Sequence, residues 1–161
     1  MRVHIIPLLL CLGCGSQQRD IHPDLRPLLD YYLSYALDGG NIEELVALRY
    51  GTSGTIREAR CDSVDKDFLG VKMRTVRQVV VLPPDAGFEY SWKATVMHEL
   101  GHCLHGLKHS KTEGDIMYPF SSNEFEEEES YWRENLDKKM RELFPEGGPR
   151  ELTEQELQEM R

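Results

Sequence analysis

The chain has 161 residues, of which 40% are hydrophobic and 29% charged, and its formal net charge at pH 7 is −9. This length and composition are typical of one folded domain with a single core of moderate size. The negative charge argues against nucleic acid as a partner, because binding to a phosphate backbone depends on an excess of Lys and Arg.

The first residues, MRVHIIPLLLCLGCGSQQ, have the layout of a secretory signal, with one arginine, a short apolar run and small residues around Cys14. The run is too short to span a bilayer permanently. The stretch CLGC at 11–14 also resembles the bacterial lipobox, in which cleavage precedes a lipid-bearing cysteine, although a cysteine occupies the leucine position. We therefore expect residues 1–13 to be a lipoprotein-type signal peptide and Cys14 to be lipidated. An ordinary cleaved signal or a buried apolar N-terminus is the alternative.

These features predict an extracytoplasmic protein, either secreted or in contact with a membrane only through its lipid anchor. Loss of Cys11 and lipidation of Cys14 would leave Cys61 and Cys103, an even number in a compartment that permits disulfides. The two could pair or remain separate buried thiols. A third possibility, that Cys61 binds a metal and holds an enzyme latent, has little support from the residues around it.

The first predicted elements are one helix and three strands. Apolar residues recur at helical spacing within 24–37, and Gly39-Gly40 ends the run. The following segments are separated by Gly, Ser and Asp, and the last is rich in β-branched residues, which is typical of strands joined by turns. The predicted strands are residues 45–50, 55–60 and 71–82.

Two further helices are predicted in the C-terminal half. One should begin near Ser91 and end at Gly106. The other begins with the capping-box pair Asn123 and Glu126 and carries one apolar stripe, which we assign to the core. The stripe is Phe125, Trp132, Leu136, Met140 and Leu143. Residues 145–149 read as a linker, and Thr153 with Glu156 could cap a short terminal helix.

Four successive glutamates occupy positions 126–129. Such a run could suggest a calcium site, but neighbouring side chains on a helix point in different directions. A solvated helix face is the preferred interpretation.

The stretch HELGHCLHGLKHS at 98–110 holds four of the six histidines in the chain. On a helix, His98 and His102 lie on one face and can direct two imidazoles at one metal ion. Glu99 would then take a proton from a zinc-bound water molecule while the zinc lowers the pKa of that water toward neutrality. The motif therefore predicts a Zn²⁺ site with Glu99 as general base.

A catalytic zinc takes three protein ligands and keeps one position open, so a third ligand is needed. The candidates are His105, His109 and a downstream glutamate. His105 lies about 10 Å along the helix axis from His98, too far for both to bind one ion. Gly106 can adopt the left-handed conformation that ends a helix, and a chain reversal there would bring His109 beneath the metal.

The motif and the later segment GDIMYP at 114–119 together resemble the metzincin zinc endopeptidases of the matrixin type, whose pattern is HExxHxxGxxH followed by a methionine turn. The resemblance implies an α+β fold with a small twisted sheet, an active-site helix, a Met-turn and a C-terminal helix. It implies His98, His102 and His109 as zinc ligands and Glu99 as catalytic base. It also implies Met117 as a hydrophobic floor under the zinc, with Tyr118 and Pro119 lining the substrate pocket.

On this basis the chain divides into an N-terminal tether at 14–23, a metzincin-like catalytic domain at 24–144 and a C-terminal tail at 145–161. One departure from the family pattern is that three residues, 103–105, separate His102 from the glycine, where the family has two. We expect a helix that is one residue longer, in preference to a local π-bulge.

The expected function is hydrolysis of a peptide or protein substrate by a zinc-dependent endopeptidase. An extended substrate could pair with the edge of the strand near 79–82. One alternative is a zinc-binding protein of the same fold whose activity was lost through the additional residue. Another is a gluzincin or amidase-type zinc hydrolase with Glu124 or Glu126 as third ligand, against which the methionine turn argues. The sequence carries no signal for an oligomeric state.

Overall fold

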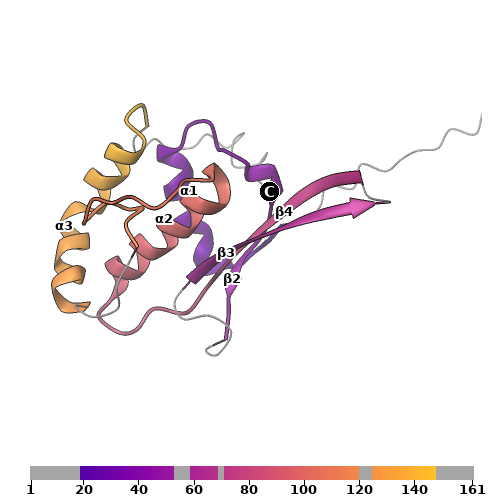
Figure 1. Cartoon of the computed structure of the whole chain (residues 1–161). Helices are drawn as coiled ribbons and strands as arrows, with labels where there is room; N and C mark the ends of the chain where they lie inside the picture. Colours follow the sequence, from indigo (N-terminus) through magenta and orange to yellow (C-terminus); the bar gives the residue numbers. More distant parts are fainter. Residues whose placement is uncertain (1–18, 53–58, 69–70, 120–124, 148–161) are drawn as a thin grey trace, which may run out of the picture.

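The computed structural model describes residues 19–52, 59–68, 71–119 and 125–147. The fold is α+β, as predicted, with a four-stranded mixed sheet and three α-helices (Figure 1). The elements in chain order are β1 (Asp20–Ile21), η1 (Pro23–Leu25), α1 (Arg26–Tyr35), η2 (Ile42–Glu44), β2 (Leu45–Tyr50), β3 (Ala59–Phe68), β4 (Val71–Val81), α2 (Glu89–His105) and α3 (Phe125–Leu143).

The predicted elements agree with this order. The strand expected at 45–50 has those bounds, and the helix expected at 24–37 is divided into η1 and α1. The strand expected at 55–60 begins at Ala59 and continues to Phe68, while residues 55–58 lie outside the described part of the chain. The same holds for residues 1–18, Asn123, Glu124 and the predicted terminal helix. Within the described residues, no helix combines the length and apolar character that crossing a membrane requires.

The strand order in the sheet is β1-β2-β4-β3, with β1, β2 and β4 parallel and β3 antiparallel to β4. β4 is therefore hydrogen-bonded on both sides. The prediction that the strand near 79–82 offers its edge to a substrate is wrong, because β2 and β3 occupy both edges of that segment. The two edges of the described sheet are β1 and β3. The error arises because a strand's neighbours depend on pairings between segments distant in sequence.

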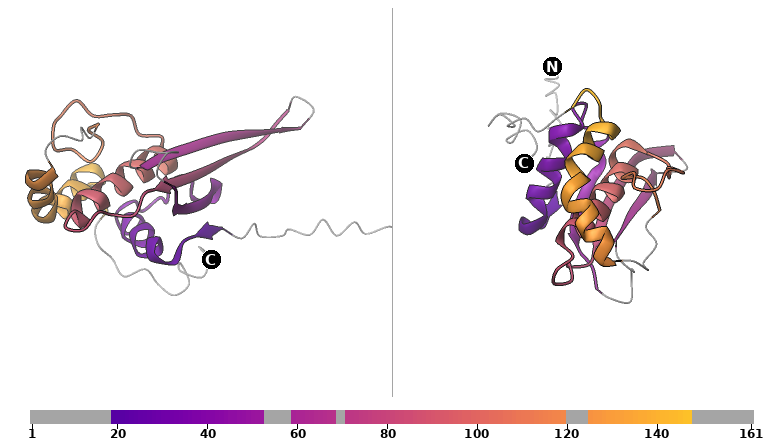
Figure 2. Two further views of the ribbon diagram at one scale, coloured as in Figure 1. Left: turned by 90° about the horizontal axis from the view of Figure 1, so that it is seen from below. Right: turned by 90° about the vertical axis from the view of Figure 1, so that its left-hand side faces the viewer.

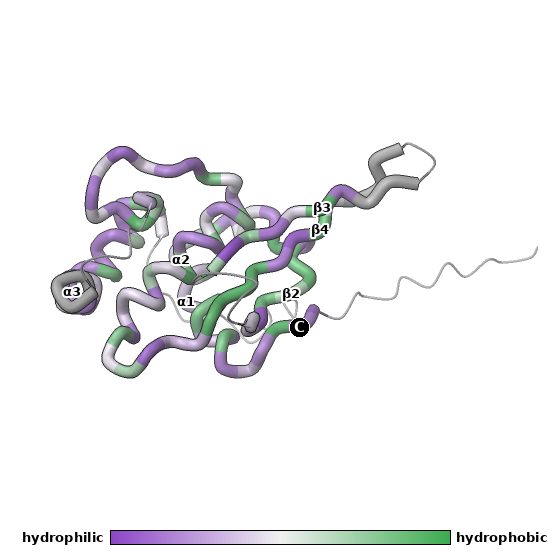
Figure 3. Tube along the Cα trace, turned by 60° about the horizontal axis from the view of Figure 1, so that its bottom comes forward, coloured by the Kyte–Doolittle hydropathy of each residue, from purple (hydrophilic) through white to green (hydrophobic). Residues whose placement is uncertain are grey.

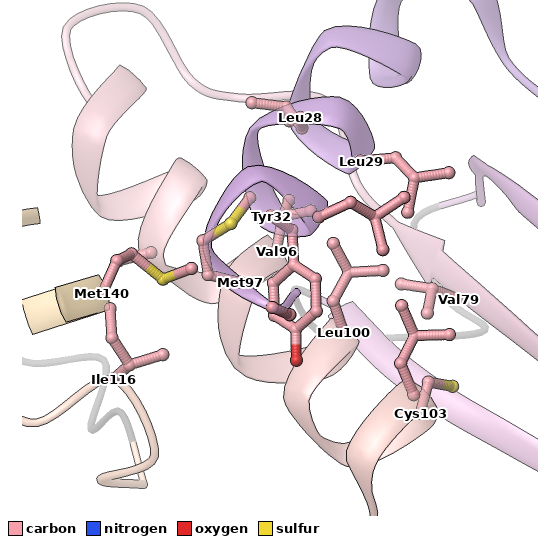
Figure 4. Packing of buried hydrophobic residues seen from close by; sticks show 14 of the residues in the cluster. Leu28, Leu29, Tyr32, Val79, Val96, Met97, Leu100, Cys103, Ile116 and Met140 are labelled. Atoms are coloured by element: carbon pink, nitrogen blue, oxygen red, sulfur yellow. The ribbon is translucent and has the colours of Figure 1, made fainter. Parts of the chain in front are cut away.

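The three helices gather at one end of the molecule, and the β3–β4 hairpin projects away from them (Figure 2). α2 contacts β3 and β4, and α1 and α3 both contact α2. β2 and the C-terminal half of β4 form hydrophobic stretches in the middle of the molecule (Figure 3). Apolar residues from three helices, β4 and the loop after α2 meet in one core (Figure 4).

α2 supplies much of this core. Val96, Met97, Leu100 and Leu104 are fully buried, and Leu100 lies among residues of α1 and β4 (Figure 4). Burial of such side chains stabilises a helix far more than its intrinsic propensity does. α2 is consequently held by its apolar side chains along its length.

The N-terminus of α2 is capped by a side chain of α3. The carboxylate of Glu129 accepts hydrogen bonds from the Tyr90 and Ser91 N–H groups, at 2.9 and 3.0 Å to Oε2, and from the Ser91 hydroxyl. Glu129 is only 6% exposed. The prediction that residues 126–129 form a solvated face is thus wrong for Glu129. A carboxylate at this position satisfies otherwise unpaired N–H groups and complements the helix dipole.

We predict that Glu129→Ala lowers the free energy of unfolding by about 1.5–3 kcal/mol, the usual value of hydrogen bonds to a charged group. The half-buried N–H of Tyr90 and the buried N–H of Ser91 would lose their acceptor. Urea denaturation measures the change, and Glu134→Ala, an exposed glutamate of the same helix, is the control. Equal stability of the two variants would contradict the capping role.

Candidate metal centre

Two of the three predicted histidines come from one face of α2. His98 and His102 lie one turn apart, with their ring centroids separated by 4.5 Å. His98 is 5% exposed, whereas His102 is half-buried. The core-facing residues of α2 fix the rotation of the helix about its axis, and this rotation turns both imidazoles toward the loop that follows.

The chain reverses at the end of α2. Gly106 has φ 62° and ψ 25°, a left-handed conformation that residues with a Cβ rarely adopt. Its N–H donates to the His102 carbonyl, and the Leu107 N–H donates to the Gly101 carbonyl. α2 continues to His105 without a break, so the prediction of a longer helix is confirmed.

The reversal returns the exposed His109 to the helix. Each of these histidines offers one ring nitrogen as a possible ligand. The three nitrogens, from His98, His102 and His109, all lie within 4.8 Å of one another. The ring of His109 is 5.2 Å from that of His98 and 4.9 Å from that of His102, measured between centroids. The structure thus brings together the three histidines singled out in the sequence, on the open side of the helix end.

Two backbone carbonyls orient the first two imidazoles. The Ile116 carbonyl lies 2.7 Å from Nδ1 of His98, and the Leu107 carbonyl lies 2.6 Å from Nδ1 of His102. Because a carbonyl can only accept, each Nδ1 must carry the proton. Both Nε2 atoms then present lone pairs, and they face each other at 2.9 Å.

This arrangement fits a metal ion. Two lone pairs at that distance repel, and a cation coordinated by both nitrogens would replace the repulsion with attraction. Histidines that bind metals commonly donate their other N–H to a backbone carbonyl or carboxylate, which fixes the tautomer and the ring orientation. Three imidazoles are a common set of protein ligands for a catalytic zinc that keeps one position open.

The electrostatics of His98 favour the neutral ring. The pKa of His98 is lowered to about 4, mainly by burial and also by the nearby His102 and His109, against the opposing effect of the Ile116 carbonyl. An imidazole must be neutral to coordinate a metal. His98 is therefore in the form that can bind a cation at neutral pH.

Glu99 lies beside the histidines and contacts the edge strand. Its Oε2 accepts a hydrogen bond from the Cys61 N–H at 2.7 Å. Burial raises the pKa of the Glu99 carboxyl above its usual value, and the nearby Asp62 acts in the same direction. The Cys61 N–H and the adjacent His102 and His109 oppose this rise. A partly desolvated carboxylate next to a candidate metal site is suited to proton transfer.

The segment after His109 folds under the helix. The Ser110 N–H donates to the Met117 carbonyl at 2.8 Å, and the Ser110 hydroxyl donates to Asp115 at 2.7 Å. Met117 is 4% exposed, and a Cβ at Gly101 would lie 2.7 Å from its sulfur. The absence of a side chain at Gly101 thus lets Met117 pack directly against α2.

Tyr118 and Pro119 follow Met117 at the surface of the same loop. Tyr118 is half-buried and Pro119 is exposed. Both are therefore accessible to a molecule approaching this loop.

His105 belongs to a different cluster. Its Nδ1 lies 2.8 Å from the Tyr32 hydroxyl, and its Nε2 lies 2.8 Å from Asp38 Oδ1. Its ring also contacts Phe144. His105 thus connects the end of α2 to α1 and the loop after it, and within the described residues it takes no part in the three-histidine cluster. Glu124 and the side chain of Glu126 lie outside the described part of the chain.

Cys61 and Cys103 form a disulfide that joins β3 to α2, with a Cα–Cα distance of 5.5 Å. Of the alternatives left open by the sequence, the two cysteines therefore pair and are not separate thiols. A sulfur in a disulfide is not a thiolate, so Cys61 is excluded as a metal ligand. Cys103 is fully buried. The bond lies one helical turn beyond Glu99 on the same helix.

Sequence reasoning missed two contributors to this region. The first is the Cys61 N–H, which donates to Glu99. Almost every residue has a backbone N–H, so the sequence gives no indication of which one lies beside the carboxylate. The second is Gly101, inside the HELGH motif, where Met117 packs directly against the helix. A glycine within a helix is costly and often marks a close approach by another segment, so this contact did have a signal in the sequence.

Comparison with protein families places this site in a known context. The family model described as Matrixin matches residues 53–141, which is more than half of the chain and includes β3, β4, α2 and most of α3. Searches of curated proteins and of solved structures gave no match.

We predict that His109→Ala abolishes retention of Zn²⁺ during dialysis against a weak chelator, whereas His105→Ala retains it. The first variant removes a member of the cluster, and the second removes a residue outside it. Zinc content per chain is measured by atomic emission. Retention by His109→Ala together with loss by His105→Ala would refute this assignment of the cluster.

Proposed function

The chain belongs to the matrixin family of metallopeptidases, and we propose that it is a zinc-dependent endopeptidase whose metal is held by His98, His102 and His109. The observation that supports this most directly is the pair of Nδ1 hydrogen bonds to backbone carbonyls, since they leave both Nε2 atoms, 2.9 Å apart, able to donate lone pairs to one ion. Glu99 lies beside that point, so a metal site and a proton acceptor adjoin each other.

Bound zinc would supply Lewis acidity, which polarises a peptide carbonyl and makes a water molecule acidic enough to lose a proton near neutral pH. The three imidazoles would hold the ion and leave its remaining position open. Ile116 and Leu107 act on the imidazoles through their carbonyls, which prevent ring rotation.

Glu99 is the proposed general base. Its Oε2 is engaged by the Cys61 N–H, which leaves Oε1 as the oxygen to accept a proton from water. The same carboxyl can later return that proton to the leaving amine, because its raised pKa brings the two protonation states closer in free energy. Hydrolysis thereby requires no covalent intermediate with the chain.

Substrate is proposed to bind along β3, the edge strand next to Glu99. A strand at the edge of a sheet has backbone groups that can pair with an extended peptide. Cys61, in β3, contacts the proposed base, so a peptide on this edge would run past the histidines. Tyr118 and Pro119 would line a side-chain pocket from the other side.

The alternative functions are less well supported. The additional residue before Gly106 is accommodated by the longer α2, which removes the reason to infer a damaged site. A gluzincin or amidase-type site would need a carboxylate as third ligand, whereas His109 occupies that place in the cluster.

We also propose an extracytoplasmic location with a lipid anchor on Cys14. The apolar run that ends at Gly13-Cys14 supports this location. The Cys61–Cys103 disulfide adds support, because such bonds persist mainly in oxidising compartments.

Replacement of the proposed base tests the mechanism. Glu99→Gln should retain zinc but lower kcat by about 10²–10⁴, the usual contribution of general base catalysis. Peptide hydrolysis and zinc content are measured on the same samples. Glu89→Gln, an exposed glutamate of α2 paired with Lys93, should hydrolyse at the wild-type rate. Equal rates for Glu99→Gln and wild type at equal zinc content would remove Glu99 from the mechanism.

Mass spectrometry of the mature N-terminus tests the location. We predict that the first residue of the exported chain is Cys14 and that it carries lipid. Cys14→Ser should release the protein from the membrane fraction, because the anchor cannot form without the thiol. An unmodified N-terminus at another residue would show that the lipobox interpretation is wrong.

A further inference from the structure

We propose that Cys61 is a positioning residue for Glu99 and that the disulfide to Cys103 holds it in place, so that turnover is full only when the disulfide is closed. This inference rests on the proposed function of Glu99 as general base. It concerns the orientation of the carboxylate and leaves the three histidines unaffected.

Cys61 is attached to α2 in two ways. Its N–H donates to Glu99 Oε2 at 2.7 Å, and its sulfur is bonded to that of Cys103. Glu99 and Cys103 are four residues apart on the helix and therefore lie on the same face, one turn from each other. The covalent bond thus fixes the Cys61 backbone beside the very turn of α2 that carries the proposed base.

The attachment of Cys61 to α2 matters because β3 is held in the sheet from one side only. β3 is one of the two edge strands, and β4 is its only partner in the described sheet. The described part of the β3–β4 hairpin extends away from the three described helices (Figure 2). A long hairpin supported at one end can shift relative to α2, and the disulfide is the covalent link that opposes this shift at Cys61.

The Cys61 hydrogen bond has a direct effect on the carboxylate. By engaging Oε2, it favours one rotation of the carboxyl group and leaves Oε1 turned away from Cys61. A proton acceptor must lie within hydrogen-bond reach of its proton. Displacement of a catalytic group by about 1 Å can lower a rate by about 10²-fold. Release of β3 would thus impair proton transfer while metal binding continued.

The main test is the double variant Cys61→Ser/Cys103→Ser. We expect kcat to fall about tenfold or more, KM to stay within about twofold, and zinc content to remain that of wild type. A purely structural disulfide would instead lower the melting temperature without changing kcat for the folded fraction. Arg77→Ala is the matched control, since it breaks the half-buried ion pair between Arg77 and Glu44 elsewhere on the sheet and should leave kcat unchanged.

Chemical reduction tests in the native chain whether kcat depends on the Cys61–Cys103 disulfide. A water-soluble phosphine reduces the disulfide to two thiols, and it takes the oxygen of one water molecule to become phosphine oxide while the two hydrogens of that water go to the sulfurs. kcat should fall as thiols appear and return when a small-molecule disulfide reoxidises the pair and is itself reduced to two thiols. Unchanged kcat at complete reduction would overturn the proposal.

Amide hydrogen exchange at position 61 gives a readout that does not depend on activity. In the zinc-loaded, oxidised protein, Glu99→Ala should accelerate exchange of that amide, because the acceptor is gone. The double cysteine variant should accelerate it as well. Unchanged protection in Glu99→Ala would overturn the proposal even if the cysteine variant failed to fold. If oxidised wild type hydrolysed no peptide, the proposed function would fail, and the exchange data would still decide whether Cys61 positions Glu99.

Discussion

The left-handed turn at Gly106 is the constraint on which the site depends. It stops α2 directly after His105 and sends the following segment back along the helix. This reversal has two effects on the histidine cluster. The Leu107 carbonyl reaches the ring of His102, and His109 arrives beside both helical histidines. A residue with a Cβ would oppose this conformation, because the left-handed region is costly for L-amino acids. One glycine thereby sets the position of a histidine and the tautomer of another.

α2 serves the core and the site with opposite faces. Its apolar face packs against α1 and β4, and Glu129 of α3 caps its first turn, so the helix has little freedom to rotate or slide. The histidines and Glu99 take their positions from this rigid element. Sites built on packed helices are held more closely than sites built on loops. The one loop residue of the cluster, His109, is followed by Ser110, whose backbone and hydroxyl are both bonded within the returning segment.

The parts that could be predicted from sequence are those that depend on local spacing. Helical periodicity placed His98 and His102 on one face, and the combination of Gly106 with the later methionine indicated His109. The parts that were missed depend on contacts between distant segments. The place of β4 inside the sheet, the burial of Glu129 and the donor to Glu99 all require knowledge of which element lies beside which. The choice between a disulfide and two free thiols was open for the same reason.

From the sequence alone one could name the candidate metal ligands, the helical segments and the glycine at which the chain could reverse, because spacing, capping and glycine conformation act over a few neighbouring residues. The tertiary structure was needed to show that β3 is one of the two edge strands and that Cys61 lies against the face of α2 carrying Glu99 and Cys103. It was also needed to show that His105 is hydrogen-bonded to Tyr32 and Asp38. Those contacts join residues tens of positions apart. They form because burying the apolar face of α2 against the sheet and α1 brings these segments together, and no short stretch of sequence records that packing.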